Sequence, residues 1–481
     1  PCLVSAEPCV RGSRWLSGTG GIHLPTSPPM TRIGPRSEPG GLLACGLPCQ
    51  YVRVPQPRSH RAAFDRFSAR DRAFRWRCQV DLQDVQRLVQ PADSKALLLV
   101  LDGLGGLPRE VGGPTELEAA RTPNLDAMVG RGDLGLQVPV AVGVTPGSGP
   151  GHWALFGYDP LVYQIGRGVL EALGVGFELR PRDVAVRGNL CTVDSAGRVV
   201  DRRAGRISTE DAIPVIEAMD GIEVPGGEVI VRPVKEHRFL IVARPDEPST
   251  AEIGDTDPGR TGLEPLAVEA RAADSEPAAR LVRAWLERVP EVLAGRDRAN
   301  MGLLRGFAQL PDWPRFPEVF GWRSLAIAAY PMYRGVARLV GMDAVEVADS
   351  PDALAPALEA ARDDYDFFFL HVKGTDKAGE DGDFDRKVAT IEQVDSALPG
   401  IMDAGPDVVL VTGDHSTPAV MRAHSWHPVP FLVAGGMGRG EPGAPSFGET
   451  ACRSGSIGLI RGCELMPLLA ARAGRLTKFG A

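Results

Sequence analysis

Four short runs of consecutive apolar residues constrain the fold of this 481-residue chain more than any other feature. A half-exposed strand alternates apolar and polar residues, whereas a continuous apolar run is typical of a strand covered on both faces. Helix-like segments separate the runs, so we expect an α/β fold whose mostly parallel sheet carries helices on both faces. The runs span 96–101, 366–372, 407–412 and 430–434. The helices we expect span 117–131, 351–362, 384–398 and 464–473.

Acidic residues follow three of these strands close to the point where each strand ends. Asp102 follows the first run, Asp376 lies shortly after the second, and Asp414 and His415 follow the third. The carboxyl ends of parallel strands meet at one edge of a sheet, where ligands bind. One aspartate in such a position is commonly a helix cap. Three of them favour a shared site over three separate caps.

The residue types at this edge suit a pair of divalent metal ions. Carboxylate oxygens and imidazole nitrogens bind hard and borderline cations, and two-metal sites hold their ions about 3.5–4 Å apart. Asp376 and Glu380 are four residues apart, so on a helical turn both carboxylates face the same ion, and His424 adds an imidazole. For Glu380 a second interpretation has equal weight, namely a solvated acid in the polar stretch 380–383. His427, three residues after His424, is better explained as a residue behind the ligands or at the surface than as a metal ligand.

The glycine-rich stretch 144–152 places the hydroxyl group of Ser148 before an apolar, helix-like run. Pro150 fits the first turn of a helix, because its missing N–H costs nothing there. Ser148 would then lie at a helix N-terminus, where free N–H groups and the helix dipole stabilise a phosphate or an alkoxide. Taken alone, the stretch is better explained by a plain N-cap serine. The metal-ligand residues elsewhere favour a nucleophile that a metal ion activates.

Composition limits the partners of the chain. A net charge of −8 argues against a general nucleic-acid binder, and no apolar run approaches the roughly 18 residues that span a bilayer. Only three cysteines follow residue 90, none with metal-type spacing, which suits a reducing cytoplasm. We therefore expect a cytoplasmic protein that acts on a small molecule, with no nucleic-acid or membrane partner. The sequence leaves the oligomeric state open.

Residues 1–90 differ in composition from the rest of the chain. They contain 13 arginines, no lysine and six acidic residues, and their Pro-, Gly- and Ser-rich sequence has little periodicity. We expect this segment to be disordered, or to be a non-native extension outside the enzyme. It has a weak similarity to an Arg- and Ser-rich transit peptide.

Residues 181–305 interrupt the alternation of strands and helices that builds the sheet. Short alternating segments there, such as 183–187, predict a smaller inserted α+β domain between the core segments 91–180 and 306–481. Basic residues gather in this insert, and paired arginines suit a small substrate that carries a carboxylate and a phosphate. Each arginine taken singly is better explained by a solvated surface charge. The basic candidates are Arg187, Arg202, Arg203, Arg206, His237, Arg238 and Arg305.

Six motifs follow one another along the chain: LVLDGLGG (99–106), RTPNLD (121–126), TPGSGPGH (145–152), FGYDP (156–160), DRRAGR (201–206) and TGDHST (412–417). In this order they resemble the cofactor-independent phosphoglycerate mutases of archaeal type, which belong to the alkaline phosphatase superfamily. The resemblance runs from about Lys95 to the C-terminus and does not cover residues 1–90. It implies an alkaline-phosphatase-like fold and an inserted domain that closes over the substrate.

The resemblance also implies a reaction. It points to an enzyme of glycolysis and gluconeogenesis that interconverts 3-phosphoglycerate and 2-phosphoglycerate through a phosphoserine. Two divalent metal ions would take part, usually manganese, with magnesium, cobalt or zinc as alternatives.

Individual residues receive roles from the same resemblance. Ser148 corresponds to the phosphorylated nucleophile. One metal site comprises Asp102, Ser148, Asp414 and His415, and the other comprises Asp376, Glu380 and His424. The substrate-binding positions are Arg187, Asn189, Arg203, Arg206, His237, Arg238, Asn300 and Arg305, with His237 either a proton shuttle or a phosphate contact.

Two positions depart from the family pattern. Glu380 stands where family members commonly have a histidine ligand, so the metal preference or affinity of this chain is in question. Arg334 stands where they tend to have a lysine. It keeps the charge that stabilises the transferring phosphoryl group, although a planar guanidinium is not equivalent to an ammonium. Two alternatives stay open: a metal-dependent phosphatase or phosphotransferase acting on another small hydroxyl compound, and a non-catalytic paralogue that binds metal or phosphate.

Overall fold

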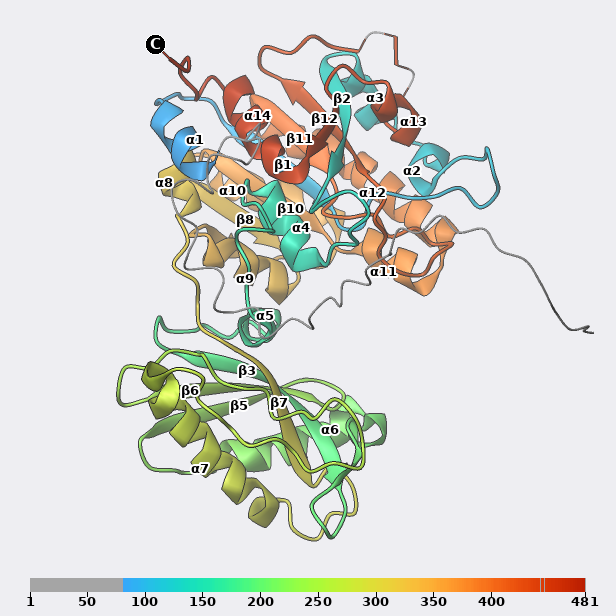
Figure 1. The fold of residues 1–481 in the computed structure, drawn as a ribbon. Coiled ribbons are helices and arrows are strands. Elements are labelled where there is room, and N and C mark those ends of the chain that lie inside the picture. The colour runs from blue at the N-terminus through green and yellow to red at the C-terminus, as the bar shows by residue number, and fades with distance from the viewer. Residues whose placement is uncertain (1–80, 442, 445, 481) are drawn as a thin grey trace, which may run out of the picture. The chain divides into compact units, whose positions relative to one another are not determined.

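A computed structural model describes residues 81–441, 443–444 and 446–480 of the chain (Figure 1). The disorder expected for residues 1–80 concerns a segment outside these described residues. For residues 81–90 the expectation is wrong, because helix α1 (Leu82–Leu88) forms there and buries Leu82 and Val85. The Asp81 carboxylate accepts the first-turn N–H of Asp84 at 2.9 Å and so caps the helix. The last ten residues of the expected segment therefore include a helix.

A sheet of eight strands carries the ends at which the acidic residues lie. Its strands are β1 (Ala96–Leu101), β2 (Gly132–Val138), β8 (Ser324–Ala328), β9 (Asp343–Val345), β10 (Phe367–Val372), β11 (Val408–Thr412), β12 (Val429–Gly435) and β13 (Gly458–Arg461). They lie in the order β13-β2-β12-β11-β1-β10-β8-β9. Neighbouring strands are parallel except that β12 runs antiparallel to both β11 and β2. The predicted mostly parallel sheet is confirmed.

Helices cover both faces of this sheet, as predicted. One layer contains α1, α4 (Ser148–Leu155), α8 (Phe316–Phe320), α9 (Pro331–Leu339) and α14 (Leu465–Arg472). The other contains α2 (Glu116–Ala119), α3 (Pro123–Val129), α10 (Leu354–Ala361), α12 (Phe384–Asp403) and α13 (Glu449–Arg453). Successive residues of β1 point alternately into the two layers, and all six are fully buried. None of the helices in the described ranges combines the length and apolar character needed to span a membrane.

The helix expected over residues 117–131 is in fact two helices, α2 and α3. The chain is extended at Ala120 and turns into α3 at Pro123, which occupies the first helical position. A proline there has no N–H to give to a preceding turn, so it starts a helix rather than continuing one. The sequence pattern was right about the apolar spacing and wrong about the break.

A second sheet of five strands lies between β2 and β8 in the chain. Its strands are β3 (Val184–Val193), β4 (Val199–Asp201), β5 (Gly227–Lys235), β6 (Arg238–Pro245) and β7 (Met301–Ala308). Their order is β4-β3-β6-β5, with β7 also paired to β3, and every pairing is antiparallel. Helices α6 (Thr209–Asp220) and α7 (Glu276–Val292) bury one face of this sheet (Figure 1). Helix α5 (Arg167–Gly174) packs against β3 and β7 and also against α9. We keep the division into core and insert as a proposal, with this sheet as the centre of the insert.

Candidate active site

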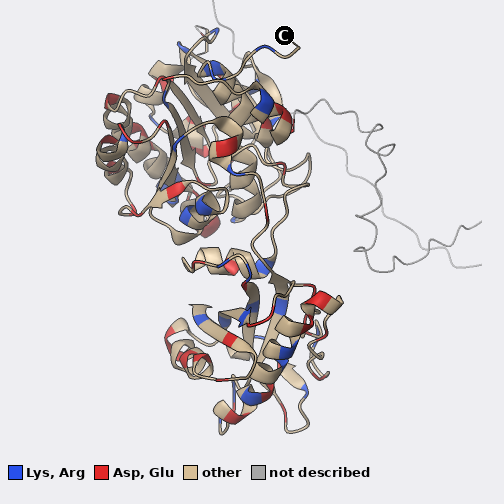
Figure 2. Cartoon of the chain, turned by 90° about the vertical axis from the view of Figure 1, so that its left-hand side faces the viewer, with Lys and Arg blue, Asp and Glu red and all other residues tan. Residues whose placement is uncertain are grey.

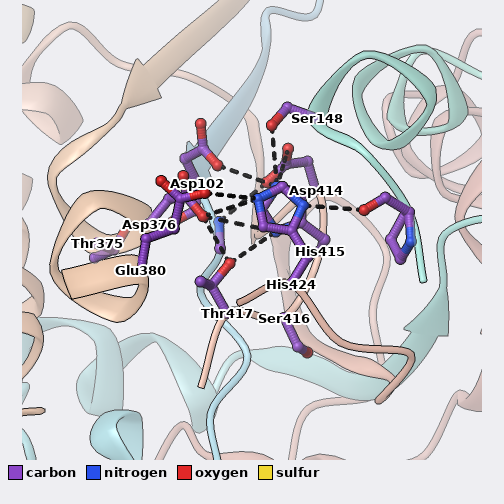
Figure 3. A network of polar contacts seen from close by, with 12 residues as sticks. Asp102, Ser148, Thr375, Asp376, Glu380, Asp414, His415, Ser416, Thr417 and His424 are labelled. Carbon is purple, nitrogen blue, oxygen red and sulfur yellow. Dashed lines mark hydrogen bonds and ion pairs between the residues drawn. The ribbon is translucent and has the colours of Figure 1, made fainter. Parts of the chain in front are cut away.

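The three strands that precede the acidic residues lie side by side at the centre of the larger sheet, in the order β11-β1-β10. Asp102 immediately follows β1, and Asp376 lies in the first turn of α11 (Gly374–Asp381), the helix after β10. Asp414 and His415 follow β11. Because parallel strands end at the same edge, these four side chains meet there (Figure 3). All four are completely buried.

One group of potential metal ligands consists of Asp102, Asp414 and His415, whose ligand atoms lie within 4.8 Å of one another. His415 Nε2 is 3.4 Å from Asp102 Oδ1 and 3.2 Å from Asp414 Oδ2. The Ser148 hydroxyl lies 3.1 Å from the same nitrogen. The structure thus brings together the four residues expected to form one metal site.

A second group consists of Asp376, His415 and His424. His424 Nε2 lies 3.4 Å from Asp376 Oδ1, and the two histidine rings stack with their centroids 3.7 Å apart. Glu380 lies at the margin of this group: one of its oxygens is 3.7 Å from His424 Nε2, and its side chain is 55% exposed. His415, expected in one site only, belongs to both groups.

The donor set fits divalent cations. Among the described residues, Asp102 Oδ1 is a buried carboxylate oxygen that has no hydrogen-bond partner. A buried polar atom in this condition is costly, so its presence points to a partner that the protein itself does not supply. Oxygen and imidazole ligands of this kind suit manganese, magnesium, cobalt or zinc.

The ionisation of two carboxylates in the cluster also favours cation binding. Burial opposes ionisation of Asp376, but hydrogen bonding to His424 and the nearby charge of Lys373 lower its pKa to about 2. Burial of Asp102 acts in the same opposing sense, and His371, Lys373 and His415 hold the pKa of Asp102 well below its ordinary value. Both carboxylates are therefore ionised at neutral pH.

Ser148 begins helix α4, with Gly147 as the N-cap residue. Its hydroxyl thus lies at a helix N-terminus, as the sequence predicts, beside free N–H groups. The close approach of α4 to the metal-ligand loops depends on Gly151, since a Cβ atom there would lie 2.4 Å from the Asp414 carbonyl oxygen. His152, one turn further on, places Nδ1 2.8 Å from the Ser148 carbonyl oxygen and 3.1 Å from Asp414 Oδ2.

Lys and Arg positions recur along the part of the chain that contains the smaller sheet (Figure 2). A basic pocket lies against that sheet. It is a cavity of about 320 Å³ lined by Arg167, Arg187, Asn189, Arg202, Arg203, Arg206, Glu236, His237, Arg238 and Arg305. Seven of the eight expected substrate-binding residues line it. The eighth, Asn300, does not: its side-chain amide accepts the Val193 N–H at 2.8 Å and donates to the Val193 carbonyl at 3.1 Å. Asn300 therefore ties the end of β3 to the start of β7.

The pocket has the features of a built binding site. The buried atoms Asn189 Oδ1 and Arg238 Nε have no hydrogen-bond partner within the described part of the chain. Arg206 and Glu236 adopt positive φ angles of 54°, a strained conformation that non-glycine residues hold mainly at functional sites. Burial and the neighbouring Arg238 lower the pKa of His237, so this imidazole is neutral near pH 7.

Comparisons with known proteins identify the family. A family model described as 2,3-bisphosphoglycerate-independent phosphoglycerate mutase matches residues 130–297. Over 404 residues the chain is 51% identical to a probable 2,3-bisphosphoglycerate-independent phosphoglycerate mutase of Thermus thermophilus, an alignment that covers 82% of this chain and 98% of that protein. The chain belongs to this mutase family.

Further relatives of the mutase agree with this assignment. A protein with the same description from Aquifex aeolicus is 47% identical over 407 residues, covering 82% of this chain and 99% of that protein. The solved structure of the PH0037 protein from Pyrococcus horikoshii superposes with a TM-score of 0.66 at 31% identity, covering 81% of this chain and 99% of that one. The cofactor-independent phosphoglycerate mutase from Thermoplasma acidophilum gives 0.64 at 28% identity, covering 79% and 100%. The predicted family and enzyme class are confirmed, and these relatives do not favour the phosphatase alternative.

In this mutase, Arg334 lies among groups outside the ligand cluster. Its guanidinium donates to the carbonyls of Ala328 and Ala329 and pairs with Glu346 Oε2 at 2.7 Å. None of these partners belongs to the two ligand groups. A role for Arg334 in stabilising the phosphoryl group therefore stays a prediction.

Sequence reasoning about the mutase missed several residues that touch the metal ligands. Lys373 Nζ lies 3.1 Å from Asp102 Oδ2 and 2.5 Å from Asp376 Oδ2, and the Tyr333 hydroxyl donates to Asp102. His371 Nε2 lies 3.2 Å from the same Asp102 oxygen. Lys373, three residues before Asp376, could have been found from helical spacing. Tyr333 reaches Asp102 from α9, the helix after β8, and His371 reaches it from β10, and no local pattern reveals that.

Proposed function

We propose that this mutase interconverts 3-phosphoglycerate and 2-phosphoglycerate through a phosphoserine at Ser148, with two divalent metal ions, manganese being the one expected. The observation that carries the proposal is the place of the Ser148 hydroxyl, at a helix N-terminus and 3.1 Å from His415 within the ligand cluster. Asp102, Asp414 and His415 would hold one ion with Ser148, and Asp376 and His424 the other, with Glu380 at its margin. When bound, the ions supply positive charge that lowers the pKa of the serine and stabilises the phosphoryl oxygens.

Both halves of the phosphoryl transfer take place within one enzyme–substrate complex. In the first half, the Ser148 oxygen loses its proton and bonds to phosphorus, while the bond from phosphorus to the glycerate oxygen breaks and that oxygen gains a proton. In the second half, the other hydroxyl of the same glycerate attacks the phosphoserine and the proton movements reverse. Glycerate turns between the two halves while water is kept out, because attack by water would release phosphate.

The basic pocket serves this reaction by holding the charged groups of the substrate. Guanidinium groups bind carboxylate and phosphate oxygens in pairs, and seven arginines line the cavity. The neutral His237 can accept a proton there, and we assign it the role of proton shuttle. During turnover the pocket must face Ser148, which is the closure we propose for the inserted domain. We place the reaction in the cytoplasm as a step of glycolysis and gluconeogenesis.

An enolase-coupled assay of the full chain tests the proposal. It is run without 2,3-bisphosphoglycerate, first with manganese and then with a chelator, and free phosphate is measured in parallel. We expect metal-dependent formation of 2-phosphoglycerate with little free phosphate. Predominant phosphate release would instead establish a phosphatase.

Ser148→Ala is the decisive variant. It should abolish mutase turnover and leave manganese binding in place, because the two carboxylate-imidazole groups remain. Ser208→Ala is the matched control: Ser208 caps α6, where its hydroxyl oxygen accepts the Asp211 N–H at 3.1 Å, so its loss costs about 1 kcal/mol of stability and spares activity. Appreciable turnover by Ser148→Ala would refute the phosphoserine.

A further inference from the structure

Lys387 and Glu116 form a buried pair of opposite charge behind the metal ligands. Lys387 lies in the first turn of α12, and Glu116 is the first residue of α2. Both side chains are completely buried, and Lys387 Nζ lies 4.0 Å from Glu116 Oε1. Neither was singled out by the sequence pattern, and neither touches a metal ligand.

Lys387 joins two loops through their carbonyl groups. The first loop, residues 102–107, follows β1 and begins with Asp102. The second, residues 413–419, follows β11 and contains Asp414 and His415. The Lys387 ammonium donates to the Gly105 carbonyl of the first loop at 3.0 Å and to the Thr417 carbonyl of the second at 2.9 Å.

Glu116 joins the same two loops through their N–H groups. One carboxylate oxygen accepts the Leu107 N–H of the first loop at 3.0 Å, and the other accepts the Ala419 N–H of the second at 2.7 Å. In each loop, the N–H bound by Glu116 comes two residues after the carbonyl bound by Lys387. The cation and the anion therefore fix matching positions of both loops.

Thr417 connects this arrangement to the ligands (Figure 3). Its hydroxyl donates to Asp376 Oδ1 at 2.7 Å and lies 3.0 Å from His415 Nδ1. The loops are packed without spare room, since a Cβ atom on Gly105 would lie 1.9 Å from Ser416 Oγ. A small change in the separation of the loops would thus reach ligands in both groups.

We propose that the Lys387–Glu116 pair positions the metal centre by fixing the separation of the two loops that carry its ligands. The inference rests on the proposed function in one respect, namely that the cluster binds metal ions. General stability does not explain the pair, because apolar residues of similar size usually serve a buried site as well as an ion pair does. Apolar residues could not bind four backbone groups in two loops.

Lys387→Met and Glu116→Gln test the proposal, with Lys95→Met as the matched control. Lys95 also donates to two main-chain carbonyls, those of Arg362 and Tyr365, but it lies at the start of β1, at the opposite end of the strand from Asp102. Manganese affinity is measured by electron paramagnetic resonance of free Mn²⁺ on protein shown to be folded by circular dichroism. Unfolding in the presence of chelator reports stability separately.

We expect Lys387→Met and Glu116→Gln to weaken manganese binding about 10–100-fold, the range found when outer-shell partners of metal ligands are removed. Half-maximal activation should need proportionally more manganese, with kcat largely recovered at saturation. Lys95→Met should lose stability and keep the wild-type affinity. If Lys387→Met does not fold, Glu116→Gln decides, because glutamine keeps the side-chain shape and loses only one acceptor.

Two outcomes would overturn the proposal. Manganese affinities within twofold of wild type in the folded variants would show that the pair serves stability alone. If the wild-type protein binds no manganese, the proposed metal centre is refuted, and the positioning role of the pair with it. This outcome differs from unchanged affinity in the variants, so failure of the proposed function is distinguished from failure of the positioning role.

Discussion

Glu449, the first residue of α13, carries a carboxyl group whose ionisation the fold opposes. Burial raises its pKa from 4.5 to about 7, although hydrogen bonds from Thr115 and Gly106 act in the opposite direction. A raised pKa means that the folded state holds the proton more tightly than the unfolded state. The resulting stabilisation is fully present below pH 4.5 and is lost as the pH rises through 7.

Glu449→Gln isolates this effect, because glutamine keeps an acceptor for Gly106 and cannot ionise. One pKa unit corresponds to about 1.4 kcal/mol, so the full shift sets a limit of about 3 kcal/mol. Two facts reduce this limit: part of the pKa shift affects stability only below pH 5, and Glu449 is partly exposed to solvent. Between pH 5 and pH 8 we therefore expect the variant to gain about 2 kcal/mol of unfolding free energy relative to wild type.

Urea unfolding in chelator at pH 5, 6, 7 and 8 measures this difference. Glu118→Gln is the control, because the neighbouring Glu118 accepts the N–H groups of Thr115 and Thr450 and its pKa is lowered despite burial. Its stabilisation is complete above pH 4.5, so that variant should be less stable than wild type by a constant amount. A difference for Glu449→Gln that varies by less than about 0.5 kcal/mol across this range would refute the reasoning.

Two further substitutions test the basic pocket and the N-terminal helix. Asp257 binds the Arg202 guanidinium with both oxygens, at 2.9 and 2.7 Å. Because a hydrogen bond to a charged group contributes roughly 1.5–3 kcal/mol, Asp257→Asn should raise the KM for 3-phosphoglycerate about tenfold with little change in kcat. An unchanged KM in the enolase-coupled assay would contradict this prediction. Leu82→Ala should lower the unfolding free energy by roughly 2–4 kcal/mol, whereas Leu266→Ala, at a residue 52% exposed, should change it by less than about 0.5 kcal/mol. Equal effects in urea titrations would show that α1 is not part of the folded unit.

The sequence predicts four of the eight strands of the larger sheet closely, and it does not predict β2, β8, β9 or β13. The expected run 96–101 is β1 itself, and the runs 366–372 and 407–412 each contain the observed strand with one extra residue at the start. Full burial on both faces produces an unbroken apolar run, and such a run ends where polar site residues begin. The boundary between α2 and α3 was missed, because Pro123 breaks the helix within an apolar spacing that is otherwise regular.

The sequence predicts several site residues that follow a strand, although Lys373, directly after β10, was missed. Asp102, Asp414 and His415 follow strands directly. Arg167, by contrast, enters the basic pocket from α5, a separate helix before the smaller sheet. Its place depends on packing between elements, which residue spacing does not encode. Asn300 lies next to β7 and was assigned to the substrate, yet its amide bonds to the main chain of β3.

The order of the strands along the chain has a consequence for synthesis on the ribosome. The partners of β1 in the larger sheet are β10 and β11, which are translated after the whole of the smaller sheet. Strands β3 to β7 pair only among themselves, so all strands of the smaller sheet are available before the partners of β1 have been made. Until residue 372 has emerged, the apolar β1 has neither of its neighbours, and until residue 412 has emerged it has only β10. An unpaired apolar strand of this kind is prone to pair with other chains, so the interval before β10 and β11 are made is the one in which the growing polypeptide is most exposed to aggregation.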